Sequence, residues 1–256
     1  MTLLKYIFIL ALIITSSACL EPTDAANTVK ANNQQETPSA ENDANKPKTE
    51  APHNQTVATE EFTQKILSPD EIISPLESIK KLDQMIEAYH LGQELTPEEE
   101  SENRLLKQKI IKGTFDIQEL CRLSLGKHWE EITKDQQQEF VKLMTTLLET
   151  KAIFSKEQLK GSNKYYTIVY KKETYDDAEK TKATIFTDMN VPKEKITLNI
   201  TYKMLTTPYG WKIFDVIVDD ASLLANYKFQ FDRIILKSGF EDLIGRMNNK
   251  LKEISK

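Results

Sequence analysis

The chain has 256 residues, of which 39% are hydrophobic and 29% are charged, a composition typical of one folded domain with some additional sequence. Its formal net charge of -5 argues against a nucleic-acid partner, because phosphate groups are bound by clustered lysine and arginine side chains. No apolar run approaches the roughly 20 residues of a membrane-spanning helix, which excludes a multi-span membrane protein.

Residues 1–18 are predicted to be a lipoprotein signal peptide. A short basic start ends at Lys5, an unbroken apolar run covers residues 6–14, and small residues precede Cys19. The run has the length of a signal-peptide core. A cysteine directly after such a core and its small residues resembles the bacterial lipobox, so we expect Cys19 to be acylated and to anchor the protein to a membrane. The alternative is a plain secretory signal followed by an unmodified cysteine.

Residues 19–65 are predicted to be the acylated cysteine followed by a disordered tether. Asparagine, glutamine, threonine, proline, glutamate and alanine dominate it, and its larger aliphatic residues are only Leu20, Val29 and Val57. So little apolar surface cannot offset the entropy that is lost on ordering. A flexible coil of about 45 residues spans roughly 35 to 40 Å, which lets a following domain move away from the membrane while it stays attached.

Residues 66–256 are predicted to fold, beginning with helices. Pro69 and Pro75 open a helical region that ends near residue 89, and three more helices are expected over residues 97–112, 116–125 and 133–154. Thr133 and Gln136 have the spacing of a capping box. Cys121 lies at helical spacing among apolar neighbours, which indicates a small buried side chain rather than a catalytic thiol.

Four strands are predicted next, over residues 165–171, 181–188, 195–205 and 210–218. The third alternates strictly between apolar and polar residues, which is the period of a sheet with one face on a core. The short turn at Pro208 and Gly210 makes the last two strands antiparallel. Two helices, over residues 222–237 and 240–254, complete an α+β fold in which helices pack on a four-stranded, curved antiparallel sheet.

Three blocks give the most specific pattern: Leu-Gly-Lys-His-Trp at 125–129, Trp-Lys-Ile-Phe-Asp-Val at 211–216, and Asn-Tyr-Lys-Phe-Gln-Phe at 226–231. In this order and with these gaps they resemble the MlaC family of toluene-tolerance proteins. The resemblance spans roughly residues 69–251 and identifies residues 66–256 as an MlaC-like phospholipid-binding domain. Asp220 departs from the family pattern, which usually has glycine there.

The resemblance implies a periplasmic carrier that passes phospholipid between membrane complexes and so maintains the lipid asymmetry of the outer membrane. Its implied partners are phospholipid, an inner-membrane ABC transporter with MCE-domain subunits, and an outer-membrane MlaA-like lipoprotein. Phospholipid is the cargo, and no cofactor or metal is expected. Typical members are soluble after signal cleavage, whereas this chain is expected to stay anchored through Cys19.

A carrier of this kind needs an apolar pocket, which we expect between the sheet and its covering helices. The candidate lipid-binding residues come from the predicted helices and from the alternating strand. They are Leu143, Met144, Leu147, Ile196, Leu198, Ile200, Tyr202, Leu224, Tyr227 and Phe231. Each of them is equally suited to an ordinary hydrophobic core, and the residue pattern leaves both interpretations open.

The polar residues do not indicate catalysis. His53, His90 and His128 are the only histidines and have no metal-ligand spacing. Asp219 and Asp220 are adjacent at a strand end, where capping of the next helix is the expected role. We therefore expect no enzyme. Two alternatives remain: a lipoprotein interaction module without a lipid ligand, and a lipid-modifying enzyme with an unrecognised acidic site.

Overall fold

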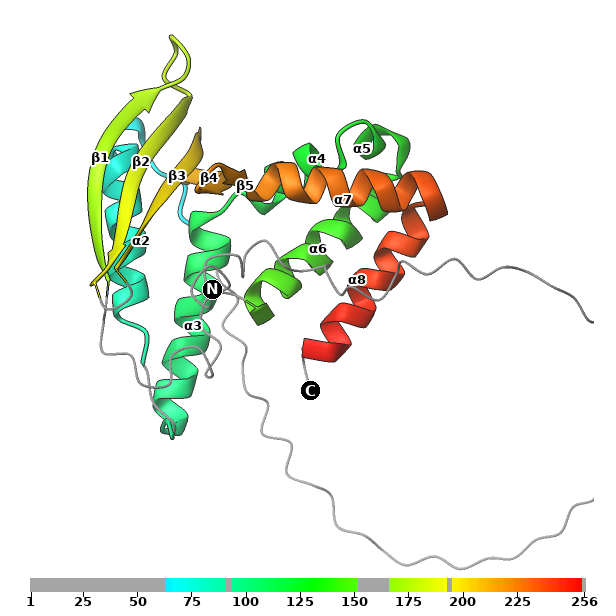
Figure 1. Cartoon of the computed structure of the whole chain (residues 1–256), viewed down its shortest axis with the longest axis horizontal. Coiled ribbons are helices and arrows are strands. Elements are labelled where there is room, and N and C mark those ends of the chain that lie inside the picture. The colour runs from blue at the N-terminus through cyan, green and yellow to red at the C-terminus, as the bar shows by residue number, and fades with distance from the viewer. Residues whose placement is uncertain (1–62, 91–93, 152–165, 193–194, 255–256) are drawn as a thin grey trace, which may run out of the picture. The chain divides into compact units, whose positions relative to one another are not determined.

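A computed structural model describes residues 63–90, 94–151, 166–192 and 195–254 of the chain (Figure 1). The predicted signal peptide, Cys19 and most of the predicted tether lie outside these residues, as does the last part of the helix predicted over 133–154. Among the helices of the described residues, none is long and apolar enough to cross a membrane.

The strands form one curved antiparallel sheet in which neighbours in the chain are neighbours in the sheet (Figure 1). They are β1 Thr167–Tyr175, β2 Lys182–Val191, β3 Ile196–Thr207, β4 Gly210–Val218 and β5 Ala221–Ser222. The predicted α+β class and antiparallel sheet are confirmed. The fifth strand was not predicted, because two residues are too short to show an alternation.

β5 exists because Asp219 and Asp220 reverse the chain directly after β4. Their φ angles are 46° and 67°, in the left-handed region that the central residues of a type I′ turn occupy and that glycine adopts most easily. The Asp219 carboxylate accepts a hydrogen bond from the Asn199 amide at 2.9 Å. The expectation that one of these aspartates caps the next helix is wrong. Ser222 is the cap, and its hydroxyl accepts from the Ala225 amide at 2.9 Å.

The helices begin and end close to the predicted positions. They are the 3₁₀ helix η1 Pro69–Glu71 and the α-helices α2 Pro75–Glu87, α3 Pro97–Thr114, α4 Ile117–Leu125, α5 His128–Glu131, α6 Lys134–Lys151, α7 Leu223–Ser238 and α8 Phe240–Ile254. Side chains of Ser74, Thr96 and Asp116 accept the amide hydrogen bonds that start α2, α3 and α4. The predicted capping box is confirmed, since Thr133 and Gln136 exchange bonds of 2.9 and 3.2 Å. The short α5 was missed, because a single turn has no periodicity.

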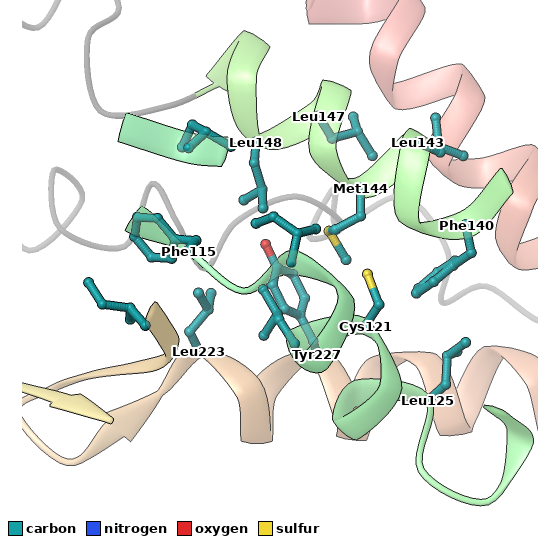
Figure 2. Packing of buried hydrophobic residues seen from close by; sticks show 14 of the residues in the cluster. Phe115, Cys121, Leu125, Phe140, Leu143, Met144, Leu147, Leu148, Leu223 and Tyr227 are labelled. Carbon is teal, nitrogen blue, oxygen red and sulfur yellow. The ribbon is translucent and has the colours of Figure 1, made fainter. Parts of the chain in front are cut away.

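Helices α4, α6, α7 and α8 pack against one another, and their facing side chains make up much of the main hydrophobic core (Figure 2). The rings of Tyr227 and Phe231 stack at 5.3 Å, and Phe140 meets Phe231 edge-on at 5.6 Å. Cys121 is fully buried in this cluster, as predicted, and its burial raises the pKa of the thiol well above the ordinary value. A neutral buried thiol is a packing element.

Candidate functional site

The sheet side that faces α2 is called the inner face here, and strand register defines its members. Residues directly opposite one another in an antiparallel ladder lie on the same face. The inner face consists of Ile168, Tyr170, Glu173 and Tyr175 of β1, Ala183, Ile185, Thr187, Met189 and Val191 of β2, Ile196, Leu198, Ile200, Tyr202, Met204 and Thr206 of β3, and Trp211, Ile213, Val216 and Val218 of β4. Most of these side chains are apolar, so this face offers an apolar surface along its whole length.

Helix α2 is fixed along the inner face by two hydrogen bonds from β1. The Tyr170 hydroxyl donates to an Asp83 carboxylate oxygen at 2.5 Å, in the second half of the helix. The Glu173 carboxylate accepts from the Leu76 amide at 3.0 Å, where the first amides of a helix have no partner within the helix. These two contacts hold the first turn and the second half of α2 over the sheet.

The middle of the inner face is incompletely covered. Ile185 and Ile200, which flank Tyr202 on neighbouring positions of the sheet, are 0% and 4% exposed. Tyr202 and its partner Val216 on β4 nevertheless keep part of their surface accessible. Both side chains pack against the main hydrophobic core, so they are partly accessible residues at its edge on the sheet.

Protein surrounds most of the Tyr202 side chain. Burial, with a smaller contribution from the charge of Asp83, raises the pKa of the Tyr202 hydroxyl well above its ordinary value. Tyr170 and Tyr166 also face this hydroxyl. Tyr202 is therefore enclosed by protein and still not fully covered, and its hydroxyl stays neutral at physiological pH.

The ten predicted lipid-binding residues lie in three places. Five are buried in the helical core: Leu143, Met144, Leu147, Tyr227 and Phe231. Three lie at one end of the inner face, where Leu198 and Ile200 are buried and Ile196 is partly buried. The remaining two, Tyr202 and Leu224, are partly buried at the border between sheet and helices.

Helix α6 does not face the alternating strand, contrary to the arrangement expected from the sequence. It packs on α3, α4 and α8, and α2 lies on the sheet instead. Leu224 is held beside β4, because its amide donates to the Asp215 carboxylate at 2.9 Å and the Ser222 hydroxyl donates to the same carboxylate at 2.7 Å. Of the predicted set, Tyr202 is thus the residue in the incompletely covered region, and Leu224 is partly buried at the start of α7.

The predicted set did not include Tyr170 and Val216, because it drew its sheet residues from the alternating strand alone, and each of the strands β1 and β4 contains a β-bulge. On β1 the register shifts between Tyr170 and Lys172. On β4 it shifts between Ile213 and Asp215, which pair with Met204 and Lys203 of β3. A bulge adds one residue and breaks the alternation, so apolar residues three apart come to share a face. The inner-face set of β1 and β4 could not be read from a period of two.

The described residues contain no group of three or more histidine, cysteine, aspartate or glutamate side chains that could hold a metal ion. The buried His128 has both ring nitrogens near carboxylates, at 2.7 Å from Glu131 and 2.9 Å from Asp232. It joins α5 to α7, which is a structural role.

Comparison with solved structures identifies the fold. The chain is similar to a phospholipid-binding protein from Ralstonia solanacearum that was solved in complex with a phospholipid. The TM-score is 0.55 at 19% sequence identity, and the match covers 70% of this chain and 98% of the other. No curated protein matches the sequence significantly.

The family comparison covers the same region. The family described as MlaC protein matches residues 80–249, which run from the first turns of α2 into α8 and include the whole sheet. The match extends over well more than half of the chain, and the resemblance inferred from three short blocks is confirmed. The chain belongs to the MlaC family.

Proposed function

We propose that this protein binds phospholipid and carries it through the periplasm. The observation that carries the proposal is the incomplete cover over Tyr202 and Val216, in the middle of an apolar sheet face. Membership of the MlaC family supports it, as does the similarity in fold to a protein that binds a phospholipid. The acyl chains are proposed to lie along the inner face, next to Tyr202, Val216 and Leu224.

The energetics explain why a carrier needs such a face. A phospholipid with about 30 acyl methylenes would lose on the order of 24 kcal/mol if these chains entered water, at about 0.8 kcal/mol per methylene. No protein can release lipid into solution at that cost. A carrier must offer a surface as apolar as the bilayer, so that transfer at each membrane is close to balanced.

Native mass spectrometry of the chain from residue 20 onward tests the proposal. We expect close to one intact phospholipid per chain after purification without detergent, because the inner face would otherwise expose apolar surface. An empty protein would instead support the interaction module. Lysophospholipid or free fatty acid in the bound fraction would indicate hydrolysis.

We further propose that Cys19 is acylated and anchors the carrier to a membrane. The basic start, the apolar run and the small residues before Cys19 support this proposal. The variant Cys19→Ala should move from the membrane fraction to the soluble periplasmic fraction. The control variant Thr23→Ala, which keeps Cys19, should stay in the membrane fraction. Continued membrane association of Cys19→Ala would contradict the anchor.

The same family membership supports the proposed partners. They are an inner-membrane ABC transporter with MCE-domain subunits and an outer-membrane MlaA-like lipoprotein, between which the carrier would maintain outer-membrane lipid asymmetry. A tether of about 45 residues, if it is a flexible coil, lets the domain reach roughly 35 to 40 Å from its anchor. Delivery would then take place close to the anchoring membrane.

A further inference from the structure

Helix α7 has an apolar stripe on the side that faces away from the core. Phe229 is 62% exposed and Leu236 is 65% exposed, while Tyr227 and Phe231 of the same helix are fully buried. Ala225, Phe229 and Leu236 follow one another at spacings of four and seven residues, so they lie on one side of the helix. Large apolar side chains that are exposed together on one helix face commonly mark an interaction surface.

Basic side chains border this stripe. Lys228, Arg233 and Lys237 are exposed on α7, and the Arg233 guanidinium lies over the Phe229 ring at 5.5 Å. Lys127, at the start of α5, lies beside them. This concentration of positive charge contrasts with the net charge of -5 of the whole chain. We call Phe229, Leu236 and these four basic residues the α7 outer face.

The acidic residue within this surface is already paired. Asp232 lies 3.6 Å from the Lys127 ammonium and 2.9 Å from the His128 ring. These contacts lower the pKa of the Asp232 carboxyl, with the hydrogen bond to His128 as the largest cause. Its negative charge is therefore balanced locally, and Lys228, Arg233 and Lys237 determine the sign of the surface.

A shallow pocket opens next to the stripe. Its volume is about 440 Å³, and it is lined by Leu125, Gly126, Lys127, Ala225, Lys228, Phe229 and Asp232. Apolar side chains thus lie beside two lysine ammonium groups. A phospholipid offers the complementary pair of groups, an anionic phosphate and apolar acyl chains.

We propose that the α7 outer face docks on the surface of an anionic phospholipid bilayer. Phe229 and Leu236 enter the boundary between headgroups and acyl chains, and Lys127, Lys228, Arg233 and Lys237 contact lipid phosphates. The docking goes beyond lipid carriage, because it concerns a second surface and does not require lipid on the inner face. It would hold the domain at a membrane during exchange.

Vesicle flotation tests the proposal, with the chain from residue 20 onward so that an anchor does not contribute. The hydrophobic core lies entirely within the residues that this shortened protein retains, so we expect it to fold. We expect binding to vesicles of phosphatidylethanolamine and phosphatidylglycerol at low salt, weak binding to phosphatidylcholine vesicles, and release as salt screens the charges. Lys228→Glu/Arg233→Glu should weaken binding at least about tenfold, because it reverses two cations near the lipid surface.

Matched variants distinguish a role of the α7 outer face in vesicle binding from a general effect of the added negative charge. Lys81→Glu/Lys109→Glu makes the same change in net charge on exposed positions of α2 and α3, and should leave vesicle binding unchanged. Phe229→Asp should weaken binding, whereas Tyr209→Asp at the 43% exposed β3–β4 turn should not. All four variants should retain the lipid content of the unchanged chain in native mass spectrometry, so this proposal and lipid carriage can fail separately.

The outcomes that would overturn the proposal are distinct. Absence of binding to anionic vesicles would do so, as would equal losses in the two double variants. Binding to an acidic protein without binding to vesicles would assign the α7 outer face to a protein partner and would also overturn it.

Discussion

Lys212 is a lysine that the fold buries on β4, with only 4% of the residue exposed. Its ammonium donates to the Gly113 carbonyl oxygen at the end of α3. Burial lowers the pKa of Lys212 to about 8, and the charge of Asp116 opposes this shift only in part. In the unfolded chain the pKa returns to its ordinary value near 10.5, so the unfolded state holds the proton to higher pH.

The stability of the protein should therefore rise with pH between about 8 and 10.5, where the unfolded state binds the additional proton. We expect the free energy of unfolding of the unchanged chain, relative to Lys212→Met, to increase by about 2 kcal/mol from pH 7.5 to pH 9.5. Chemical denaturation at the two pH values measures it. A difference between the two proteins that does not change with pH would contradict the account, because it would show that folding does not lower the pKa of Lys212.

Individual residues were predictable where one local rule acts alone. Thr133 and Gln136 form their capping box because both partners lie within one helical turn. Cys121 is buried because its neighbours at helical spacing are apolar. Val216 was missed because a bulge at Phe214 changes which side chains of β4 share a face with Ile213. A rule of fixed period cannot detect an inserted residue.

At the scale of elements, the helices and strands were predictable and their packing partners were not. The strand over 210–218 was predicted with the bounds that β4 has, because Gly210 and the aspartate turn delimit it. The apolar side chains of α6 were expected over the sheet, but α2 occupies that place. Both helices have an apolar face, and periodicity does not say which one meets the sheet. The hydrogen bonds of Asp83 and Glu173 place α2 on the sheet.

The contact between Tyr170 and Asp83 should hold the second half of α2 on the sheet. Tyr170→Phe removes a hydroxyl that donates to a carboxylate, which typically costs about 1.5 to 3 kcal/mol, less where the pair is partly exposed as here. We expect a lower free energy of unfolding and faster hydrogen exchange in Pro75–Glu87, with no change in Leu223–Ser238. Tyr209→Phe, which removes an exposed hydroxyl at the β3–β4 turn, is the control. Equal exchange rates in α2 for both variants would contradict this role.

At the scale of the whole molecule, two apolar regions differ in how completely they are filled. In the core of α4, α6, α7 and α8 the rings of Tyr227 and Phe231 stack and both residues are fully buried. On the inner face, Tyr202 and Val216 keep accessible surface although helices lie above them. The first region stabilises the fold, and the second is the region where we propose that the acyl chains bind. Half of the predicted lipid-binding residues belong to the first region.

The family could be inferred from the sequence because a few blocks keep their order and spacing, and the fold follows from the family. The position of the incompletely covered region could not, because it depends on which side chains leave space unfilled. Packing of this kind is a property of the assembled elements and not of any one pattern in the chain.

A matched pair of valine substitutions tests most directly whether lipid occupies this region. Val216→Trp adds an indole on the inner face beside Tyr202, and Val169→Trp adds the same group on the other side of the sheet, where Val169 is 45% exposed. The measurement is the number of phospholipids per chain by native mass spectrometry, with thermal unfolding as a check on folding. We predict that Val216→Trp stays folded and retains less than about half of the phospholipid that Val169→Trp retains, because the indole fills space that acyl chains would use. Equal phospholipid content in the two folded variants would contradict the account.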